Sequence, residues 1–177
     1  MTEALAHELA AVVPDDLEHH PALAHVSPGA DVLQAYWRNS GLWLRDEWVC
    51  ELAVLADGQP VGLQALEGKD FAARRVVDTH SWLVAGARGR GWGKQMRAAV
   101  LSLAFEHVGA RWAITEAWAD NDASLGVSRS LGYVDNGTDV HPGPRVMQRL
   151  LLEAGAFSSP WPVTVDGVED CLPLFGA

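Results

Sequence analysis

Three glycines alternate with larger residues in the stretch Arg88-Gly89-Arg90-Gly91-Trp92-Gly93. The apolar run at residues 81–85 before this turn predicts a strand, and apolar residues recur at helical spacing between Met96 and Val108 after it. Glycine adopts positive φ readily, so the N–H groups of such a turn can point inward, and the following helix N-terminus adds partial positive charge. This order of elements predicts a binding site for an anion, best a pyrophosphate; the alternative is an ordinary strand–helix connection.

The turn is basic although the chain is acidic. Four cationic side chains lie in or beside it: Arg88, Arg90, Lys94 and Arg97. Two nucleotide-binding motifs do not fit, because the third glycine comes one residue early for G-x-G-x-x-G and the Gly-Lys-Ser/Thr of a P-loop is missing. A nucleotide-binding protein of the Rossmann type is therefore disfavoured, and the sequence also lacks a second βαβ unit.

The composition limits the class of protein. The chain has 177 residues, of which 49% are hydrophobic, and this predicts one domain with a substantial core. The net charge of −10 disfavours nucleic acid as a partner, and it is compatible with a cationic substrate or with simple solubility. No stretch is apolar and long enough for a membrane span, and no signal peptide is found. Cys50 and Cys171 match no metal spacing, so we expect no metal and a cytoplasmic location.

The hydrophobic pattern predicts an α/β domain. Helices are expected at residues 3–13, 30–43 and 121–131. Strands are expected at residues 48–55, 61–66, 75–84, 111–118, 133–140 and 145–152, with a hairpin at Asp57-Gly58 and a loop at 69–73. The tail carries Pro160, Pro162 and Pro173, which exclude a regular helix. His19, His20 and His25 lie in an expected loop, without the spacing of a metal site.

Two blocks of the sequence resemble the GNAT acetyltransferase superfamily. The first is R-x-x-G-x-G, filled by Arg88, Gly91 and Gly93, which is similar to the acyl-coenzyme A turn of that family. The second begins at Asn121 and ends in Leu-Gly followed by the aromatic Tyr133. The resemblance covers residues 48–152. Within the superfamily, the chain is most similar to the ribosomal-protein N-terminal (Rim-type) acetyltransferases.

The resemblance implies the GNAT fold, an α/β fold whose central, mixed and mostly antiparallel sheet has a splayed strand pair and helices on both faces. A single domain would span residues 1–177, with a core at 48–152 and a C-terminal extension at 153–177. The strand that usually opens the family's fold is not found, because the chain enters directly at a helix-like segment. A homodimer is an expectation of the family.

The implied function is direct transfer of an acetyl group from acetyl-CoA to a primary amine within a ternary complex. The acceptor would be a protein N-terminus or a small-molecule amine. Cys50 is not a convincing nucleophile, so no acyl-enzyme is expected. The alternative is a non-catalytic GNAT-like domain, which would bind an acyl-CoA as a sensor or serve as a partner-binding subunit.

The resemblance also assigns an acetyl-CoA site. The pantetheine arm would lie beside the strand before the turn, where the Leu83 N–H would polarise the thioester carbonyl. The turn would bind the pyrophosphate through N–H groups, aided by the side chains of Arg88 and Arg90. Asn121 would bind the arm, and it also suits a helix N-cap, a role that does not exclude the first. The expected cofactor-binding residues are Trp82, Leu83, Val84, Arg88, Gly89, Arg90, Gly91, Trp92, Gly93, Lys94, Asn121, Ser124 and Ser128.

Acetyl transfer also requires a base for the amine and a donor to the thiolate. Glu116 is the expected base, because related N-terminal amine acetyltransferases carry a glutamate five residues before their asparagine; a surface strand glutamate is the alternative, and His80 and Asp78 are rivals. Strand alternation places Ile114, Glu116 and Trp118 on one face. Ser128 stands where many relatives have an acidic tyrosine, so it would donate a hydrogen bond to the thiolate or make room for the sulfur.

Six residues are expected at the acceptor site. They are Tyr36, Trp37, Trp43, Trp118, His141 and Arg145. The early aromatic residues would suit a flat or apolar part of the acceptor, and core packing is the alternative for each of them.

Overall fold

The computed structural model describes residues 1–17, 26–140 and 145–177. These residues form one six-stranded sheet with the order β1-β2-β3-β4-β6-β5. The strands are β1 (Glu47–Ala56), β2 (Gln59–Lys69), β3 (Val76–Leu83), β4 (Trp112–Trp118), β5 (Val134–Val140) and β6 (Val146–Glu153). Neighbouring strands are antiparallel except β3 and β4, which are parallel. The predicted mixed, mostly antiparallel sheet is confirmed.

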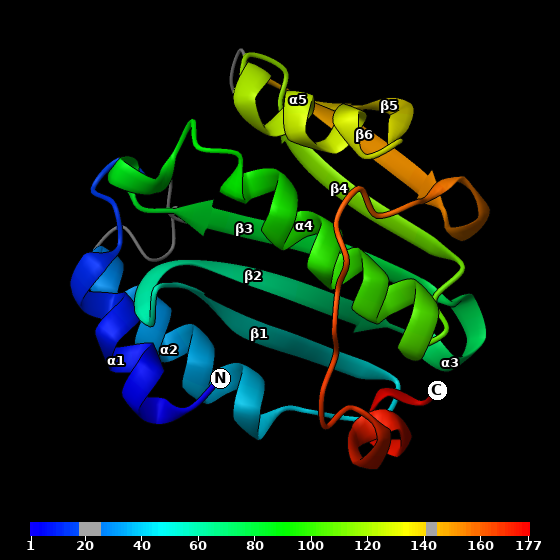
Figure 1. Ribbon diagram of the computed structural model, residues 1–177, viewed down its shortest axis with the longest axis horizontal. Coiled ribbons are helices and arrows are strands. Elements are labelled where there is room, and N and C mark those ends of the chain that lie inside the picture. The colour runs from blue at the N-terminus through cyan, green and yellow to red at the C-terminus, as the bar shows by residue number, and fades with distance from the viewer. Residues whose placement is uncertain (18–25, 141–144) are drawn as a thin grey trace.

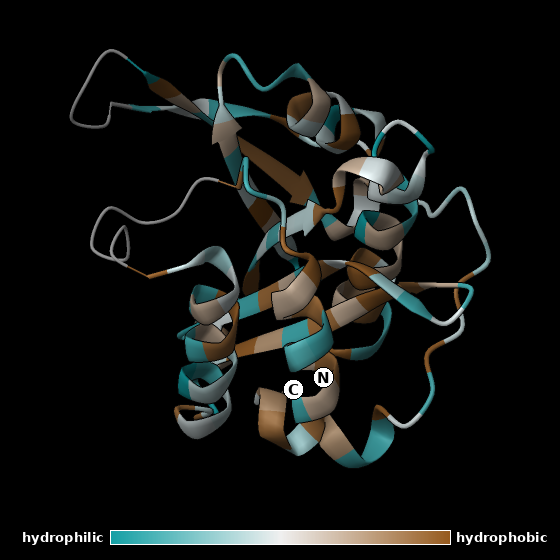
Figure 2. Ribbon diagram, turned by 90° about the vertical axis from the view of Figure 1, so that its left-hand side faces the viewer, coloured by the Kyte–Doolittle hydropathy of each residue, from teal (hydrophilic) through white to brown (hydrophobic). Residues whose placement is uncertain are grey.

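Helices cover both faces of the sheet (Figures 1 and 2). They are α1 (Glu3–Val12), α2 (Pro28–Gly41), α3 (Phe71–Arg74), α4 (Trp92–Ser102), which continues into a π-helical turn (Leu103–His107), and α5 (Asp122–Ser130). On one face, Leu9 of α1 and Val32 of α2 pack against Leu63 and Ala65 of β2. On the other face, α4 and α5 cover the larger core, to which Leu66 of β2 belongs. Odd and even residues of β2 thus serve different cores, as the alternation of strand side chains requires.

Local expectations are met at the turn between β1 and β2 and fail at residues 69–73. Asp57 and Gly58 have φ of 49° and 76°, which suits the two-residue hairpin turn predicted there. The expected loop at 69–73 is wrong, because Phe71 is buried and begins the short helix α3. In the described part of the chain no strand precedes α1, so β1 lies at the edge of the sheet.

The C-terminal extension forms part of the core. It runs past α4, and its 3₁₀ segment Glu169–Phe175 reaches the beginning of β1 (Figure 1). There Trp48, which is 1% exposed, packs against the Phe175 ring at a centroid distance of 4.8 Å. The Trp48 indole also donates a hydrogen bond to the Phe175 carbonyl at 3.2 Å. Residues far apart in the sequence therefore close one end of the sheet.

Strands β3 and β4 pair over three residues and then diverge. Residues 76–78 of β3 pair with residues 112–114 of β4. Beyond this point β3 continues along β2 as far as Leu83, and β4 continues along β6 as far as Trp118. The two strands separate toward the glycine turn that follows β3 (Figure 1). The expected splayed pair is thus present.

Two of the expected features fall outside the described residues. They are the histidines at 19, 20 and 25 and the acceptor residue His141. Within the described chain, no helix is both long and apolar enough to cross a membrane.

Candidate active site

The backbone of Leu83 faces the gap between β3 and β4. The Val84 N–H donates to the Val61 carbonyl at 2.9 Å, so the hydrogen-bonded pairs of β2 and β3 include residues 61 and 84. Antiparallel pairs alternate, and Leu83 opposite Gly62 therefore directs its N–H and C=O away from β2. The Leu83 carbonyl instead accepts from Arg88 Nε at 3.0 Å. By the same alternation, the amides of Trp82 and Val84 face β2, so of these three expected residues only Leu83 offers its amide to the gap.

The glycine turn presents backbone donors at the same end of the gap. Gly89 and Gly91 have φ of 74° and 85°, a conformation that favours glycine. Within the described residues, no carbonyl or side chain accepts from the N–H groups of residues 89–93. The N–H groups at both ends are used, since Arg88 donates to the Ala85 carbonyl and Lys94 donates to the Gly91 carbonyl. The backbone N–H groups that can bind an anion are therefore those of residues 89–93, without the N–H groups of Arg88 and Lys94.

The side chain of Arg88 binds Asp16 in the N-terminal segment. Its NH2 atom lies 2.8 Å from Asp16 Oδ1, and its NH1 atom binds the other carboxylate oxygen. The Arg88 guanidinium lowers the pKa of the Asp16 carboxyl by hydrogen bonding. Both side chains are well exposed, so the pair contributes little to stability. The charge of Arg88 is thus already paired with a carboxylate, whereas Arg90 is exposed at the turn.

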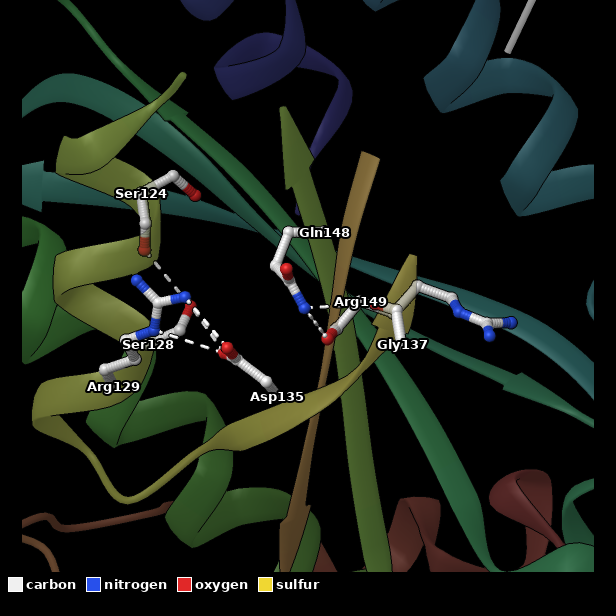
Figure 3. A network of polar contacts seen from close by, with 7 residues as sticks. All are labelled: Ser124, Ser128, Arg129, Asp135, Gly137, Gln148 and Arg149. Atoms are coloured by element: carbon white, nitrogen blue, oxygen red, sulfur yellow. Dashed lines mark hydrogen bonds and ion pairs between the residues drawn. The ribbon is translucent and has the colours of Figure 1, made fainter. Parts of the chain in front are cut away.

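Helix α5 carries Asn121, Ser124 and Ser128, of which Ser128 accepts from Arg97 under the gap at 3.5 Å. Asn121 is the N-cap, because its Oδ1 accepts from the Ser124 N–H at 3.1 Å. Ser128 is buried, and its hydroxyl donates to the Ser124 carbonyl at 3.2 Å (Figure 3). On the outer side of the helix Arg129 pairs with Asp135 of β5. The capping alternative for Asn121 is observed, and the Ser128 proton is already used within the helix.

The structure adds Arg97, which the sequence placed only among the cations beside the turn. Arg97 points from α4 toward the sheet and is 4% exposed. Its guanidinium donates to Ser81 on β3 at 3.1 Å and to Thr115 on β4 at 3.4 Å. It therefore spans the two diverging strands. The available signal was its helical row, which it shares with the apolar Leu101 and Val108.

The opposite face of the diverging strands carries the candidate bases. Val77 belongs to the core under α4, and Thr115 binds Arg97, so Asp78, His80 and Glu116 project to the other face. A shallow pocket of about 340 Å³ on this face is lined by residues that include Asp78, Glu116 and Arg149. Glu116 is exposed and lies opposite Arg149 of β6. The predicted carboxylate is therefore accessible to an amine.

The environment of His80 suits a neutral imidazole. Partial desolvation first, and the positive charge of Arg97 second, lower the pKa of His80, although the ring still contacts solvent. A histidine with a lowered pKa is unprotonated at neutral pH and is able to accept a proton. The arrangement therefore keeps His80 as a second candidate base beside Glu116.

Burial raises the pKa of Asp78 to about 6, and the charges of Glu67 and Glu116 act in the same direction. The Thr79 N–H, 2.6 Å from Asp78 Oδ1, opposes this shift. Because the pKa in the folded state exceeds that in the unfolded state, stabilisation by the protonated form is complete below pH ~4 and is lost as the pH rises through ~6.

We expect Asp78→Asn to remove this loss. The free energy of unfolding of the variant, relative to wild type, should rise by about 2–3 kcal/mol between pH 4 and pH 7. Urea unfolding at both pH values measures the difference. Asp166→Asn at an exposed position is the control. A pH-independent difference for Asp78→Asn would show that the Asp78 carboxyl does not titrate as described.

The expected acceptor residues separate into two groups. Trp118 and Arg145 come together at the open end of β4, where the Arg145 guanidinium lies 4.2 Å from the Trp118 ring centroid. Tyr36 is half-buried one helical turn after the buried Val32, on the side of α2 that faces the sheet. The positions of these three residues are thus compatible with the expected contact to an acceptor.

Trp37 and Trp43 lie elsewhere. Trp37 is 51% exposed, and its indole donates to Glu3 of α1 at 3.4 Å. Trp43 stacks on Trp48 at 5.8 Å and donates to the Leu174 carbonyl at 2.9 Å. It therefore packs at the end of the sheet where β3 and β4 remain paired. The structure supports the core-packing alternative for Trp43 and a surface contact between helices for Trp37. Trp92, expected at the cofactor, lines a pocket together with residues 54–57 at the hairpin of β1 and β2.

A family profile described as the acetyltransferase (GNAT) domain matches residues 4–134. The chain belongs to the GNAT acetyltransferase family. As predicted, this GNAT protein is an N-acetyltransferase with acetyl-CoA as its cofactor. The diverging strands and the glycine turn therefore belong to a protein whose family uses an acyl-coenzyme A.

Solved structures share the fold of this GNAT protein. A ribosomal-protein-alanine N-acetyltransferase from Brucella melitensis is 24% identical with a TM-score of 0.65, and the match covers 86% of this chain and 96% of that chain. A mutant spermidine N-acetyltransferase from Vibrio cholerae is 10% identical with a TM-score of 0.68, over 88% and 93% of the two chains. The aminoglycoside acetyltransferase AAC(6')-Ib, in complex with coenzyme A, is 18% identical with a TM-score of 0.66, over 88% and 93%. The names of these proteins specify different acceptors, so the likeness shows the fold and leaves the acceptor open.

Proposed function

We propose that this GNAT protein transfers the acetyl group of acetyl-CoA directly to a primary amine, which belongs to a protein N-terminus or to a small molecule. The observation that carries the proposal is the position of two donor groups at one gap. The Leu83 amide faces the space between β3 and β4, and the N–H groups of residues 89–93 lie at its open end. A thioester arm lying in this gap would place its carbonyl at Leu83 and its pyrophosphate at the turn.

The residues around the gap then have separate tasks. The Leu83 N–H stabilises the oxyanion that forms on the carbonyl oxygen. The turn holds the pyrophosphate through backbone amides, with Arg90 and Lys94 adding charge at its rim. Burial raises the pKa of the Cys50 thiol to about 11, so this cysteine is protonated and unsuited to form an acyl-enzyme. Direct transfer within a ternary complex is therefore favoured over a covalent intermediate.

The acceptor amine would approach from the face that carries the pocket. Glu116 on β4 lies beyond the last residue paired with β3, and it is exposed beside this pocket. It would take the ammonium proton before the nitrogen attacks, with His80 as the alternative base. Trp118 and Arg145 would contact the acceptor at the open end of the strand. An acceptor screen followed by mass spectrometry, with N-terminal peptides, polyamines and aminoglycosides, would identify the class; the Rim-type proposal requires acetylated N-terminal peptides.

We expect Glu116→Gln to lower kcat about a hundredfold, because the base is lost while the size of the side chain is retained. Steady-state thiol release with the acceptor found in the screen measures this. Glu67→Gln is a matched control, since Glu67 lies on the same face but opposite Asp78, where the strands are still paired. Wild-type kcat in Glu116→Gln would assign the base to His80 or to solvent. Acetyl-CoA binding without thiol release from any amine would instead favour the sensor alternative.

A further inference from the structure

A buried cation lies beneath the gap between β3 and β4. The Arg97 guanidinium donates to four oxygens, all of them neutral. They are Gln64 Oε1 at 3.4 Å, Ser81 Oγ at 3.1 Å, Thr115 Oγ1 at 3.4 Å and Ser128 Oγ at 3.5 Å. These oxygens come from three strands and from α5. The charge is therefore fixed under the place where the strands diverge.

Among the described residues, no acidic group forms an ion pair with this cation. Across residues 1–17, 26–140 and 145–177, no carboxylate lies within ion-pair distance of Arg97. The titratable groups that interact with it are Asp78 and His80, which project from the opposite face of β3, and the buried Tyr133 hydroxyl. Removing a guanidinium from water is costly, and a carboxylate normally offsets the cost. Neutral dipoles do so only in part, so the gap above Arg97 has a positive potential.

We propose that Arg97 stabilises the coenzyme A thiolate as it leaves, in the role that a proton-donating tyrosine has in many relatives. The inference rests on the proposed function, because it requires the thioester arm to lie in the gap. Ser128, at the tyrosine position, already donates its proton to the Ser124 carbonyl and accepts from Arg97 at 3.5 Å. It connects the cation to the gap and is not a proton source. A thiolate next to a fixed positive charge is a better leaving group.

The bond changes follow from this arrangement. The amine nitrogen bonds to the carbonyl carbon, and the carbon–sulfur bond breaks with its electron pair remaining on sulfur. The nitrogen loses two protons in turn, the ammonium proton before attack and a second proton after it has bonded to the carbonyl carbon, and both pass to the base on the acceptor face and then to solvent. The thiolate is held by the charge of Arg97 until it dissociates and takes a proton from water. The products are the acetylated amine and coenzyme A.

Two variants of Arg97 separate its charge from its packing. Arg97→Gln removes the charge and retains hydrogen bonding to the hydroxyl groups, whereas Arg97→Lys retains the charge. The pKa of the thiol in bound coenzyme A, followed by the ultraviolet absorbance of the thiolate during a pH titration, reports on the charge itself. We expect this pKa to lie below that of free coenzyme A in the wild type and in Arg97→Lys, and to return to the free value in Arg97→Gln. We expect kcat to fall about a hundredfold in Arg97→Gln.

Tyr133→Phe is the matched control for this titration. It removes the buried tyrosine hydroxyl that interacts with Arg97 and leaves the guanidinium in place. The thiol pKa should then remain at the wild-type value. A shift in Tyr133→Phe equal to that in Arg97→Gln would assign the effect to the tyrosine and overturn the proposal.

The remaining outcomes distinguish this inference from the proposed function. Unchanged thiol pKa and kcat in Arg97→Gln, with wild-type binding of acetyl-CoA by calorimetry, would overturn the role of Arg97 alone. A wild-type protein that does not bind acetyl-CoA would overturn the proposed function. If Arg97→Gln does not fold, Arg97→Lys decides the matter, because a thiol pKa equal to that of free coenzyme A in this charged variant would contradict an electrostatic role.

Discussion

The Gly91→Glu variant is expected to lose measurable binding of acetyl-CoA. Gly91 is the N-cap of α4, and around it the N–H groups of residues 89–93 donate to no group in the described part of the chain. A carboxylate at this position would fill the space of the pyrophosphate and repel its charge. Hydrogen bonds to charged groups contribute about 1.5–3 kcal/mol each, so loss of two of them weakens binding by at least about a hundredfold. Isothermal titration calorimetry with acetyl-CoA measures this directly.

Two controls show whether the effect comes from the site or from the backbone. A Cβ added at Gly91 would meet no atom within 4 Å, so a side chain there does not disrupt packing, but φ of 85° is strained for other residues. Gly91→Ala includes the strain without the charge and should retain most of the affinity. Gly155→Glu places the same side chain on an open surface away from the turn. Wild-type affinity in Gly91→Glu would exclude the turn as the pyrophosphate site.

The Trp48→Ala variant is expected to lower the free energy of unfolding by about 3–5 kcal/mol. Trp48 is 1% exposed, and it packs against Phe71 at 5.3 Å and Phe175 at 4.8 Å between ring centroids. Truncation would leave a cavity and would also remove the indole hydrogen bond to the Phe175 carbonyl. The C-terminal segment would then lose its main contact with β1. Urea unfolding monitored by circular dichroism gives the free energy.

Trp37→Ala is the matched control for Trp48→Ala. It removes the same side chain from a position that is 51% exposed, where the indole donates to Glu3 and meets the ring of His7, both on α1. The change in the free energy of unfolding should stay within about 1 kcal/mol. Equal losses in the two variants would contradict the assignment of the C-terminal segment to the core.

Two side chains are held by contacts with residues that lie far away in the sequence. Arg88 was expected to add charge for a ligand, yet its guanidinium binds Asp16, which is 72 positions away. Trp43 was expected at the acceptor site, yet it packs against a tail 131 positions away. In both cases the residue type and its neighbours along the chain were compatible with the expected role. The competing partner was brought close only by the fold, and no local pattern encodes such a partner.

Arg97 shows a different limit. The sequence analysis placed it only among the cations beside the turn, although it shares a helical row with the apolar Leu101 and Val108. Burial became tolerable only because three strands and α5 direct four neutral oxygens to the same point. The convergence of those oxygens depends on sheet register, and register is a property of paired strands.

Local sequence was sufficient for the strand, turn and helix around Gly91, because positive φ, helical spacing and apolar alternation act between residues a few positions apart. It was also sufficient for the hairpin at Asp57-Gly58, and it included Asn121 among the residues suited to cap α5. The divergence of β3 from β4, the direction of the Leu83 amide and the buried charge at Arg97 were set by tertiary structure. Each of these depends on which strands pair and where the pairing stops, and that choice is made by packing between segments that are far apart in the chain.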